Sequence, residues 1–453
     1  MARRNTSRRR FLKRAAGAGL AAASFHFFPD TVLGRGGHAA PNDRLHIAGI
    51  GVGGMGAANL SQMETERIVA LCDVDDAFAA GTFAKYHRAK TYKDYRVMLE
   101  QQRNLDAVLI ATPDHTHAVI ALAAMEAGKH VYCQKPLTHD IHEARVLTEA
   151  ARRTGVVTQM GNQFHSGEGI RQVCEWIWDG AIGAVREVDA WCSLKYTPFG
   201  HTGWSTLLGE RPTETPPVPD TLDWDTWIGP APFRPYHPTY HPTRWRAWWD
   251  FGCGMMGDRG VHTLDSVFWA LKLAAPTTIE VLHTEGGNAE VHPDVALVRY
   301  QFAARGDMPP VTVNWYAGTE PPRPDDLEPG RQMGDSEGGV IFKGETGKIM
   351  HGTYAAEITM IPESKLKAYE LPPPTIPRVE VSHEQNWVQC CKSGEQASSN
   401  FSYAGPLTEF VLLGNVAIRL GGKIEWDPKH IKAKGRPEAD EWIRRPYRRG
   451  WKL

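Results

Sequence analysis

The 453-residue chain lacks the sequence marks of several protein classes. Its seven cysteines are odd in number and scattered, and no Cys-x-x-Cys pair suggests a zinc or redox motif. We therefore expect most of them to be small, buried apolar residues. We also find no internal repeat, so a repeat architecture is not expected.

Long hydrophobic runs are missing too, apart from a mildly apolar stretch at residues 15–28. That stretch is too short and too rich in alanine and glycine for a stable membrane span. It follows the basic segment 7–13 (SRRRFLK) and precedes small residues at 37–40, a combination typical of a twin-arginine signal peptide. We expect residues 1–40 to direct export of the folded protein to the periplasm by the twin-arginine machinery, or to remain as an N-terminal anchor.

Positive charge is not concentrated in the expected mature chain. Residues 1–40 contain eight basic residues and one acidic residue, so their removal changes the formal net charge from −1 to −8. A nucleic-acid-binding protein needs a basic surface for the phosphate backbone, and we expect no such partner. The remaining basic cluster lies in a tail, residues 431–453, expected to be solvated or docked on a neighbouring subunit: Arg444, Arg445, Arg448, Arg449 and Lys452.

The first half of the chain alternates apolar runs with helical patterns. The apolar runs predict strands at residues 45–50, 67–73, 105–111, 129–133 and 156–160. Between them, good helix formers with apolar spacing predict helices at residues 116–127 and 139–153. This alternation indicates an α/β fold with a doubly wound parallel sheet, in a chain long enough for two domains.

A glycine-rich turn follows the first predicted strand: Gly51, Val52, Gly53, Gly54, Met55 and Gly56. In a dinucleotide fingerprint the first glycine permits a tight turn, the second lets the backbone approach a pyrophosphate, and the third allows helix and strand to pack closely. Asp73 ends the next strand, where a carboxylate binds ribose hydroxyls and repels a 2′-phosphate. The pattern predicts a Rossmann domain over residues 41–160 that binds NAD, with NADP less favoured.

Three further segments are specific in combination: residues 111–117 (ATPDHTH), 132–137 (YCQKPL) and 257–265 (GDRGVHTLD). With the glycine turn they resemble the glucose-fructose oxidoreductase / inositol dehydrogenase / rhizopine-catabolism (GFO/IDH/MocA) family. The resemblance extends to residues 222–225 (LDWD), 383–387 (HEQNW) and 405–419. It implies a second α/β domain over residues 161–430. An open, mostly antiparallel sheet in that domain would cover the nicotinamide and build the interface of a homo-oligomer.

The composition of the second half agrees with that expectation. β-Branched and aromatic runs predict strands at residues 185–191, 278–283, 295–302 and 311–315. Proline-rich stretches at residues 211–219, 320–329 and 371–377 are interpreted as surface loops, because structured segments resume on both sides.

Hydride transfer from an alcohol needs a group beside the nicotinamide that takes the hydroxyl proton. The resemblance implies that this group is Lys135, whose pKa must be lowered by burial or nearby positive charge. Asp258 and His262 match the family's substrate-binding acid and catalytic histidine, and on a helix they would share one face with Asp265. Gln134 departs from the family, which commonly has glutamate there, and this removes a charge that supports a protonated Lys135.

Further residues are expected around the cofactor. We place the following beside it: Thr112, Pro113, His115, His117, Gln134 and Asn162. A zinc site built from Asp258, His262 and the His115/His117 pair is less favoured, because the spacing matches no closed site. We therefore expect no metal.

Aromatic residues and histidines are crowded between residues 196 and 251. Flat aromatic faces with polar rims suit pyranose rings, although most of these tryptophans are expected to pack in a core or an interface. His237 and Arg244 in this segment are candidates for contact with a sugar. His165, after the last Rossmann strand, is either a further substrate contact or a hydrogen-bonded loop histidine.

Three functions remain open from the sequence. The first is NAD(P)-dependent hydride transfer at a hydroxyl of a sugar, sugar derivative or cyclitol, with Lys135 and His262 handling the proton. The second is a redox-neutral glycoside hydrolase or lyase, in which a tightly bound NAD oxidises the sugar transiently. The second explains export better, whereas the retained Lys135 favours the first. The third is a non-catalytic, cofactor-bound carbohydrate-binding protein, against which the intact set of Lys135, Asp258 and His262 argues.

Overall fold

The computed structural model describes residues 43–195, 206 and 208–453. Leu45–Leu453 form a compact unit. The predicted signal peptide, residues 1–40, lies outside the described residues, as do residues 196–205 and 207 of the aromatic segment. In the part of the chain that the structure describes, no helix is long and apolar enough to cross a membrane.

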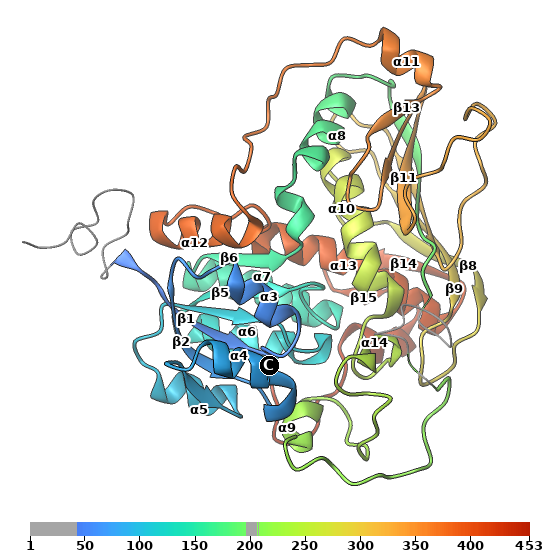
Figure 1. Cartoon of the computed structure of the whole chain (residues 1–453). Coiled ribbons are helices and arrows are strands. Elements are labelled where there is room, and N and C mark those ends of the chain that lie inside the picture. Colours follow the sequence, from blue (N-terminus) through green and yellow to red (C-terminus); the bar gives the residue numbers. More distant parts are fainter. Residues whose placement is uncertain (1–42, 196–205, 207) are drawn as a thin grey trace, which may run out of the picture. The chain divides into compact units, whose positions relative to one another are not determined.

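A six-stranded parallel sheet forms the first half of the described chain (Figure 1). Its strands are β1 (His46–Ile50), β2 (Arg67–Cys72), β3 (Lys90–Tyr92), β4 (Ala107–Ile110), β5 (His130–Gln134) and β6 (Thr158–Gly161). They lie in the order β3-β2-β1-β4-β5-β6, with every neighbouring pair parallel. The order reverses between β1 and β4, where doubly wound sheets bind their ligands at the carboxyl ends of the strands. The predicted Rossmann fold is confirmed.

Helices connect these strands, and three of them begin after a capping aspartate: Asp75, Asp94 and Asp140. They are α3 (Met55–Ser61), α4 (Asp76–Lys85), α5 (Tyr95–Gln101), α6 (His117–Glu126) and α7 (Ile141–Thr154). At the start of α7, Asp140 Oδ1 accepts the N–H of Glu143, and the Glu143 carboxylate accepts the N–H of Asp140. This reciprocal pair satisfies two backbone donors that the first turn leaves without partners. The helices predicted at residues 116–127 and 139–153 are confirmed to within two residues at each end.

A nine-stranded mixed sheet forms the second part, counted over the described residues. Its strands are β7 (Val185–Cys192), β8 (Thr278–Glu285), β9 (Val295–Phe302), β10 (Val311–Ala317), β11 (Gly338–Gly344), β12 (Lys348–Gly352), β13 (Thr359–Ile361), β14 (Lys423–Asp427) and β15 (Lys432–Ala433). The order is β13-β12-β11-β7-β10-β9-β8-β14-β15. β7 and β10 pair in parallel, and the other pairs are antiparallel. The predicted open, mostly antiparallel sheet is confirmed.

The helices of the second part are α8 (Glu168–Trp178), α9 (Trp224–Ile228), α10 (Val261–Ala270), α11 (Glu363–Ala368), α12 (His383–Ser393), α13 (Phe401–Leu420) and α14 (Asp440–Ile443). Two of these helices, α12 and α13, pack against the Rossmann domain. α13 packs on α7 and β6 as well as on β8 of the second sheet (Figure 1). In α12, Trp387 and Val388 are buried in the same core cluster as Ile47, Leu71 and Tyr132. The Rossmann core is therefore completed from a part of the chain that a linear boundary at residue 160 assigns to the other domain.

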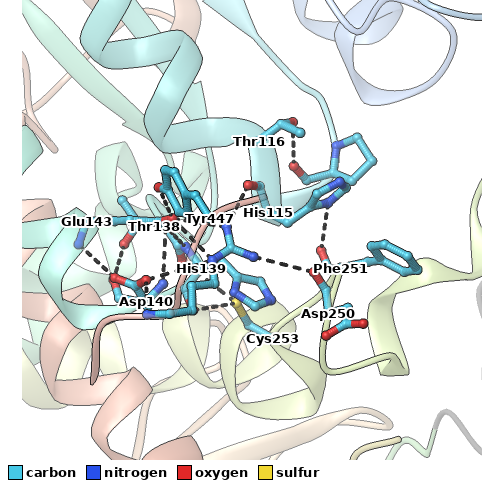
Figure 2. Close-up of polar contacts among 12 residues, drawn as sticks. His115, Thr116, Thr138, His139, Asp140, Glu143, Asp250, Phe251, Cys253 and Tyr447 are labelled. Carbon is cyan, nitrogen blue, oxygen red and sulfur yellow. Dashed lines mark hydrogen bonds and ion pairs between the residues drawn. The ribbon is translucent and has the colours of Figure 1, made fainter. Parts of the chain in front are cut away.

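The C-terminal tail also packs on the Rossmann domain of the same chain. Arg445 Nη2 donates to Glu143 Oε1 at 3.0 Å and to the backbone oxygen of His115 at 2.7 Å. Tyr447 Oη donates to the same carboxylate, and Figure 2 shows Tyr447 beside Asp140 and Glu143 at the start of α7. Arg448 pairs with Asp225. The expectation of a solvated or intermolecular tail is thus wrong for Arg445 and Arg448. Arg445 supplies the cation that the buried carboxylates at the start of α7 require. The exposed members of the basic cluster are Arg444, Arg449 and Lys452.

Candidate active site

A cavity of about 230 Å³ runs along the carboxyl ends of β1, β2, β4 and β5. It lies at the reversal in strand order, where the sheet topology predicts a ligand. Of the residues predicted from sequence, the following line it: Gly51, Gly53, Gly54, Met55, Asp73, Thr112, Pro113, Gln134, Lys135 and Asp258. The fold thus brings together the glycine turn, the acid after β2 and two of the three predicted catalytic groups.

The glycine turn is shaped by close backbone contacts. Gly51 has φ +75°, and a Cβ at Gly56 would lie 2.0 Å from the carbonyl oxygen of Gly51. Asp73 Oδ2 accepts the N–H groups of Val52 at 2.7 Å and Gly53 at 3.2 Å. Burial raises the pKa of Asp73. A glycine-rich turn next to a buried acid at the end of β2 fits the pyrophosphate and adenosine ribose of a dinucleotide.

Lys135 and Asp258 form a buried ion pair in the cavity. Lys135 follows β5, and its Nζ donates to the backbone oxygen of Asp258 at 2.8 Å and to Asp258 Oδ1. The two side chains are 16% and 7% exposed. Burial lowers the pKa of Lys135, while Asp258 opposes that shift. The lysine therefore combines a fixed position with a reduced preference for its charged form.

Three charged residues that line this cavity were not predicted from the sequence: Lys93, Asp114 and Arg246. Arg246 Nε lies 3.7 Å from Asp258 Oδ2, on the side away from Oδ1, which pairs with Lys135. Asp114 is 3% exposed, and its Oδ2 accepts the N–H of Cys253 at 3.0 Å. Burial raises the pKa of Asp114 to about 7; Asp258 adds to the shift, while Arg246 and Lys135 oppose it. Asp114 was visible in the ATPDHTH segment, but no local pattern reveals which distant residues surround it.

His262 lies at the start of α10, near Lys135 but outside the cavity lining. Burial, with the positive charges of Lys135 and Arg259, lowers its pKa well below 6.5, so the imidazole is neutral at physiological pH. Its Nδ1 is buried without a hydrogen-bond partner among the described residues. The ring lies 5.3 Å from Tyr354 and 6.3 Å from Phe164, which stack on each other at 4.0 Å. Phe164 is 47% exposed and was not predicted as a site residue.

Asp258 lines the cavity, whereas His262 and Asp265 do not, so the three residues do not form the single helix face that was predicted. Asp258 lies in a π-helical turn, Met256–Gly260, which precedes α10 and changes the angular spacing from Asp258 to the two residues of α10. Asp265 instead pairs with His165 Nδ1 at 3.0 Å and accepts Asn162 Nδ2 at 2.8 Å. His165 is only 2% exposed and lies outside the cavity lining, as does Asn162, whose Oδ1 has no partner among the described residues.

The ring nitrogens of His115 and His117 lie close to backbone carbonyl oxygens, and each neutral imidazole can donate to one of them. The nitrogens of His115 lie 3.2 Å from the oxygen of Phe251 and 3.0 Å from that of Trp227, and Figure 2 shows the contact with Phe251. The nitrogens of His117 lie 2.8 Å from the oxygens of Pro136 and Thr112. Burial lowers the pKa of His115 to about 3. These rings support the cavity wall, whereas their neighbours Thr112 and Pro113 line it.

In the described part of the chain, no group of three or more His, Cys, Asp and Glu is placed to hold a metal ion. All seven cysteines are free thiols, six of them buried and Cys391 partly exposed. The expectation that most cysteines are buried apolar residues is confirmed.

The departure at Gln134 has a structural reason. Asn59 Nδ2 donates to the buried carboxylate of Glu384 at 2.7 Å, which leaves Asn59 Oδ1 in need of a donor. Gln134 Nε2 supplies that hydrogen bond at 2.8 Å. A glutamate here has no N–H to donate when ionised, so this network requires the amide.

The aromatic segment reaches across to the end of β2. Asp223 N donates to the oxygen of Val74 at 2.9 Å, and His241 Nε2 lies 2.8 Å from Asp75 Oδ2. From this segment the cavity is lined by Thr226, Trp227, His241, Pro242, Thr243, Trp245 and Arg246. His237 and Arg244 are not among the lining residues. Trp224, Trp227 and Trp248 are buried, which confirms the expected core role of the described tryptophans.

Comparison with known protein families shows to which family the chain belongs. Residues 45–162 match the GFO_IDH_MocA model, described as an oxidoreductase family with an NAD-binding Rossmann fold. Residues 190–301 match the C-terminal alpha/beta domain of the same family. The chain belongs to the GFO/IDH/MocA oxidoreductase family. Its six-stranded domain is the family's NAD-binding domain, and its nine-stranded sheet lies in the partner domain.

Curated members of the family match part of the chain. A levoglucosan dehydrogenase of Pseudarthrobacter phenanthrenivorans is 29% identical over 115 residues, which cover 25% of this chain and 29% of that protein. An inositol 2-dehydrogenase of Rubrobacter xylanophilus is 31% identical over 148 residues, covering 32% and 42% of the two chains. The matched region is therefore less than half of each relative.

Solved structures share the fold over most of the chain. An inositol dehydrogenase homologue from Azotobacter vinelandii, in complex with NADH and myo-inositol, has a TM-score of 0.57 at 16% identity and covers 84% of this chain and 98% of its own. A levoglucosan dehydrogenase in complex with NADH and levoglucosan has a TM-score of 0.56 at 17% identity, covering 84% and 99%. At such identities the likeness establishes the architecture.

Proposed function

We propose that the protein is an NAD-dependent oxidoreductase that transfers a hydride between nicotinamide and a hydroxyl of a sugar, sugar derivative or cyclitol. The observation that carries this proposal is the buried Lys135–Asp258 pair in the same cavity as the glycine turn and Asp73. The relatives named for inositol and levoglucosan dehydrogenation support the substrate class. The redox-neutral alternative gains no support from these comparisons.

The cofactor is held by the residues around the strand-order reversal. The turn at Gly51 and Gly53 receives the pyrophosphate, and Asp73 binds the adenosine ribose and disfavours NADP. Thr112, Pro113 and Gln134 border the remaining part of the cavity. Bound NAD supplies a hydride acceptor at C4 of its nicotinamide ring.

Lys135 handles the substrate proton. Its pKa is lowered by burial, so its Nζ can accept a proton from the substrate hydroxyl, and Asp258 holds the amine in place through Oδ1. Neutral His262 donates or accepts a hydrogen bond at the substrate oxygen, because its pKa lies well below neutrality. His165, His237 and Arg244 do not line the cavity, and the structure adds no support for their predicted contact with a sugar.

The segment across the end of β2 favours slow release of the cofactor. The backbone contact between Asp223 and Val74 and the pair of Asp75 with His241 tie this segment to the Rossmann domain. We therefore expect the purified protein to retain NAD.

The function is tested in two steps with the purified mature protein. Mass spectrometry identifies any nucleotide released on denaturation, and absorbance at 340 nm then follows NADH formation with added NAD and myo-inositol, levoglucosan, hexoses or hexuronic acids. We expect NAD in the first step and substrate-dependent NADH in the second. Cleavage of a glycoside without net NADH would contradict a dehydrogenase and establish the redox-neutral cycle. A protein that binds neither nucleotide would refute both.

We also infer that the chain is exported folded through the twin-arginine route and assembles as a homo-oligomer on its open sheet. The basic segment 7–13 and the nine-stranded sheet support these proposals. Cell fractionation of the full chain and of a variant with Arg8→Lys and Arg9→Lys tests the route, since only the first should reach the periplasm. Light scattering of the mature protein tests the assembly, and a monomer would refute it.

A further inference from the structure

Asp114 is the acid of the cavity that the family motifs do not assign. It follows Pro113 at the start of the segment that leads into α6, and it is 3% exposed. The N–H of Cys253, from the other domain, fixes its Oδ2 at 3.0 Å. It lines the same cavity as the glycine turn, Lys135 and Asp258. A carboxyl buried and oriented in this way is part of the site rather than part of the surface.

The charged groups that face Asp114 come from three elements. Lys135 follows β5, Arg246 lies in the short helical segment Arg244–Ala247, and Asp258 lies in the π-helical turn. The thiols of Cys133 and Cys253 also face it, and burial raises the pKa of both well above 9, so they stay neutral. With Asp114 ionised, two acids balance Lys135 and Arg246. With Asp114 protonated, the cluster carries one net positive charge.

We propose that Asp114 is a further catalytic residue, the carboxylate that stores the proton released when a substrate hydroxyl is oxidised. This rests on the proposed dehydrogenase function. In the step, the C–H and O–H bonds of the alcohol break and a C=O bond forms. The hydride goes to NAD⁺, and the proton passes through Lys135 to the Asp114 carboxylate. Alcohol, NAD⁺ and Asp114 carboxylate thus become ketone, NADH and protonated Asp114, and the charge within the cavity is conserved.

Electrostatics explains why Asp114 suits this role. An opposite charge within about 4–6 Å lowers the pKa of a carboxyl by roughly 1–3, and loss of that charge reverses the shift. The nicotinamide ring is positive in NAD⁺ and neutral in NADH. The pKa of Asp114 is about 7 without cofactor, so at neutral pH the carboxyl is more fully ionised beside NAD⁺ than beside NADH. Asp258 is less suited, because its Oδ1 already pairs with Lys135.

Proton uptake on cofactor binding tests this assignment without a substrate. NAD⁺ and NADH are titrated calorimetrically into cofactor-free protein at pH 7, in phosphate and in Tris, whose ionisation enthalpies differ. The buffer dependence of the binding enthalpy gives the protons exchanged. We expect NADH binding to take up more protons than NAD⁺ binding, by up to about one proton. Asp114→Asn, which keeps an oxygen for the Cys253 N–H, should lose this difference, whereas Asp326→Asn at the surface should keep it.

Several results would overturn the assignment. Equal proton uptake for the two nucleotides in the wild-type protein would do so, and so would a difference that persists in Asp114→Asn, since another group would then hold the proton. If Asp114→Asn does not fold, Asp114→Ser replaces it. If the cofactor cannot be removed, infrared spectra of the holoenzyme in its NADH-bound form between pH 6 and 8 decide instead. A protonated-carboxyl band that declines through about pH 7 and disappears in the variant is expected, and its absence in the wild type would overturn the assignment.

Failure of the dehydrogenase function would have a different signature. NADH would not form from any hydroxyl compound, although the difference in proton uptake would persist. Where turnover is measurable, the wild-type kcat for oxidation should rise with pH through a value below 7, because only ionised Asp114 accepts a proton and the positive nicotinamide lowers the pKa of Asp114 in the complex with NAD⁺. Asp114→Asn should lower kcat and remove this limb of the profile. A merely structural role for Asp114 would lower activity without changing the shape of the pH profile.

Discussion

At the scale of single residues, the site depends on charges that the fold has removed from water. Lys135, Asp258 and Arg246 are all largely buried, and the Asp258 carboxylate compensates both cations. A buried ion that loses its partner is strongly destabilised, so these residues act as a unit. Gln134 follows the same rule for hydrogen bonds, because Asn59 requires a donor at that position.

Replacing Lys135 with methionine should abolish most of the turnover. The substitution keeps the length of the side chain and removes the proton acceptor, so kcat should fall by roughly 10²–10⁴-fold. NAD affinity, measured by quenching of tryptophan fluorescence, should change little, because the glycine turn and Asp73 are intact. Lys367→Met at the surface is the matched control and should retain activity. Unchanged kcat in Lys135→Met would refute the role of this lysine.

Asp73 should decide the choice between NAD and NADP. Asp73→Asn keeps an oxygen for the N–H groups of Val52 and Gly53 and removes the charge that repels a 2′-phosphate. The ratio of NADP to NAD affinity should rise by roughly tenfold, which binding titrations with both nucleotides would show. An unchanged ratio would mean that a group other than Asp73 discriminates between NAD and NADP.

At the scale of elements, two local structures depend on contacts beyond their own sequence. The glycine turn can form only because the backbone after β4 packs directly against it. A Cβ at Gly51 would lie 2.7 Å from the backbone of Ala111 and Thr112. The start of α7 has a capping box of its own, but its two carboxylates are balanced by Arg445 from the C-terminal tail.

Gly56→Ala and Gly54→Ala form a matched pair for the turn. At Gly56 a Cβ would lie 2.0 Å from a backbone oxygen that cannot move freely, whereas at Gly54 the nearest atom is 3.7 Å away. Gly56→Ala should lose NAD binding and about 1–3 kcal/mol of stability. Gly54→Ala should keep the thermal midpoint. Calorimetric unfolding and NAD titration measure both effects, and equal tolerance of the two substitutions would contradict this account of the turn.

Arg445→Met should destabilise the protein by about 3–5 kcal/mol, because it leaves the buried carboxylates of Asp140 and Glu143 without a cation. Urea unfolding measures the loss. Arg449→Met, in the same tail but exposed, should change stability by less than about 0.5 kcal/mol. Similar effects of the two substitutions would show that the tail is not anchored through Arg445.

At the scale of the whole molecule, buried neutral histidines link stability to pH in both domains. Burial lowers the pKa of His115, His292 and His383 to about 3, and that of His351 to about 4. Unfolded histidine has a pKa near 6.5, so between these values the unfolded chain binds more protons than the folded one. The contribution of each neutral histidine is therefore present above pH 6.5 and is lost as the pH falls below it.

The thermal midpoint should decline steeply when the pH is lowered from 7.5 to 4.5. Each such histidine should reduce the free energy of unfolding by about 1.4 kcal/mol per pH unit once the pH is well below 6.5. His383→Gln should make the decline shallower, whereas His87→Gln at the surface should not. A stability that is flat over this range would contradict the neutral state of these histidines.

The sequence predicted the elements whose pattern is local. Five strands of the Rossmann sheet follow from continuous apolar runs, whereas β3 is a short strand with two exposed residues and left no such signal. β11 and β12 were missed because each has only a short apolar run, residues 340–342 and 349–350, next to glycine or polar residues. Among site residues, Lys135, Asp258 and the glycine turn could be found, since their segments match family motifs. Asp114 and Arg246 could not, because their importance lies in which charges surround them.

The amino-acid sequence by itself determined the doubly wound sheet, the dinucleotide turn and the family, since each depends on residues close together in the chain. Only the tertiary structure decided that Trp387 completes the Rossmann core, that Arg445 anchors the tail to α7, and that Asp265 pairs with His165 outside the cavity lining. It also placed Asp114 beside Lys135 and Asp258. Burial and electrostatic environment arise from contacts between distant segments, and no periodicity along the chain encodes them.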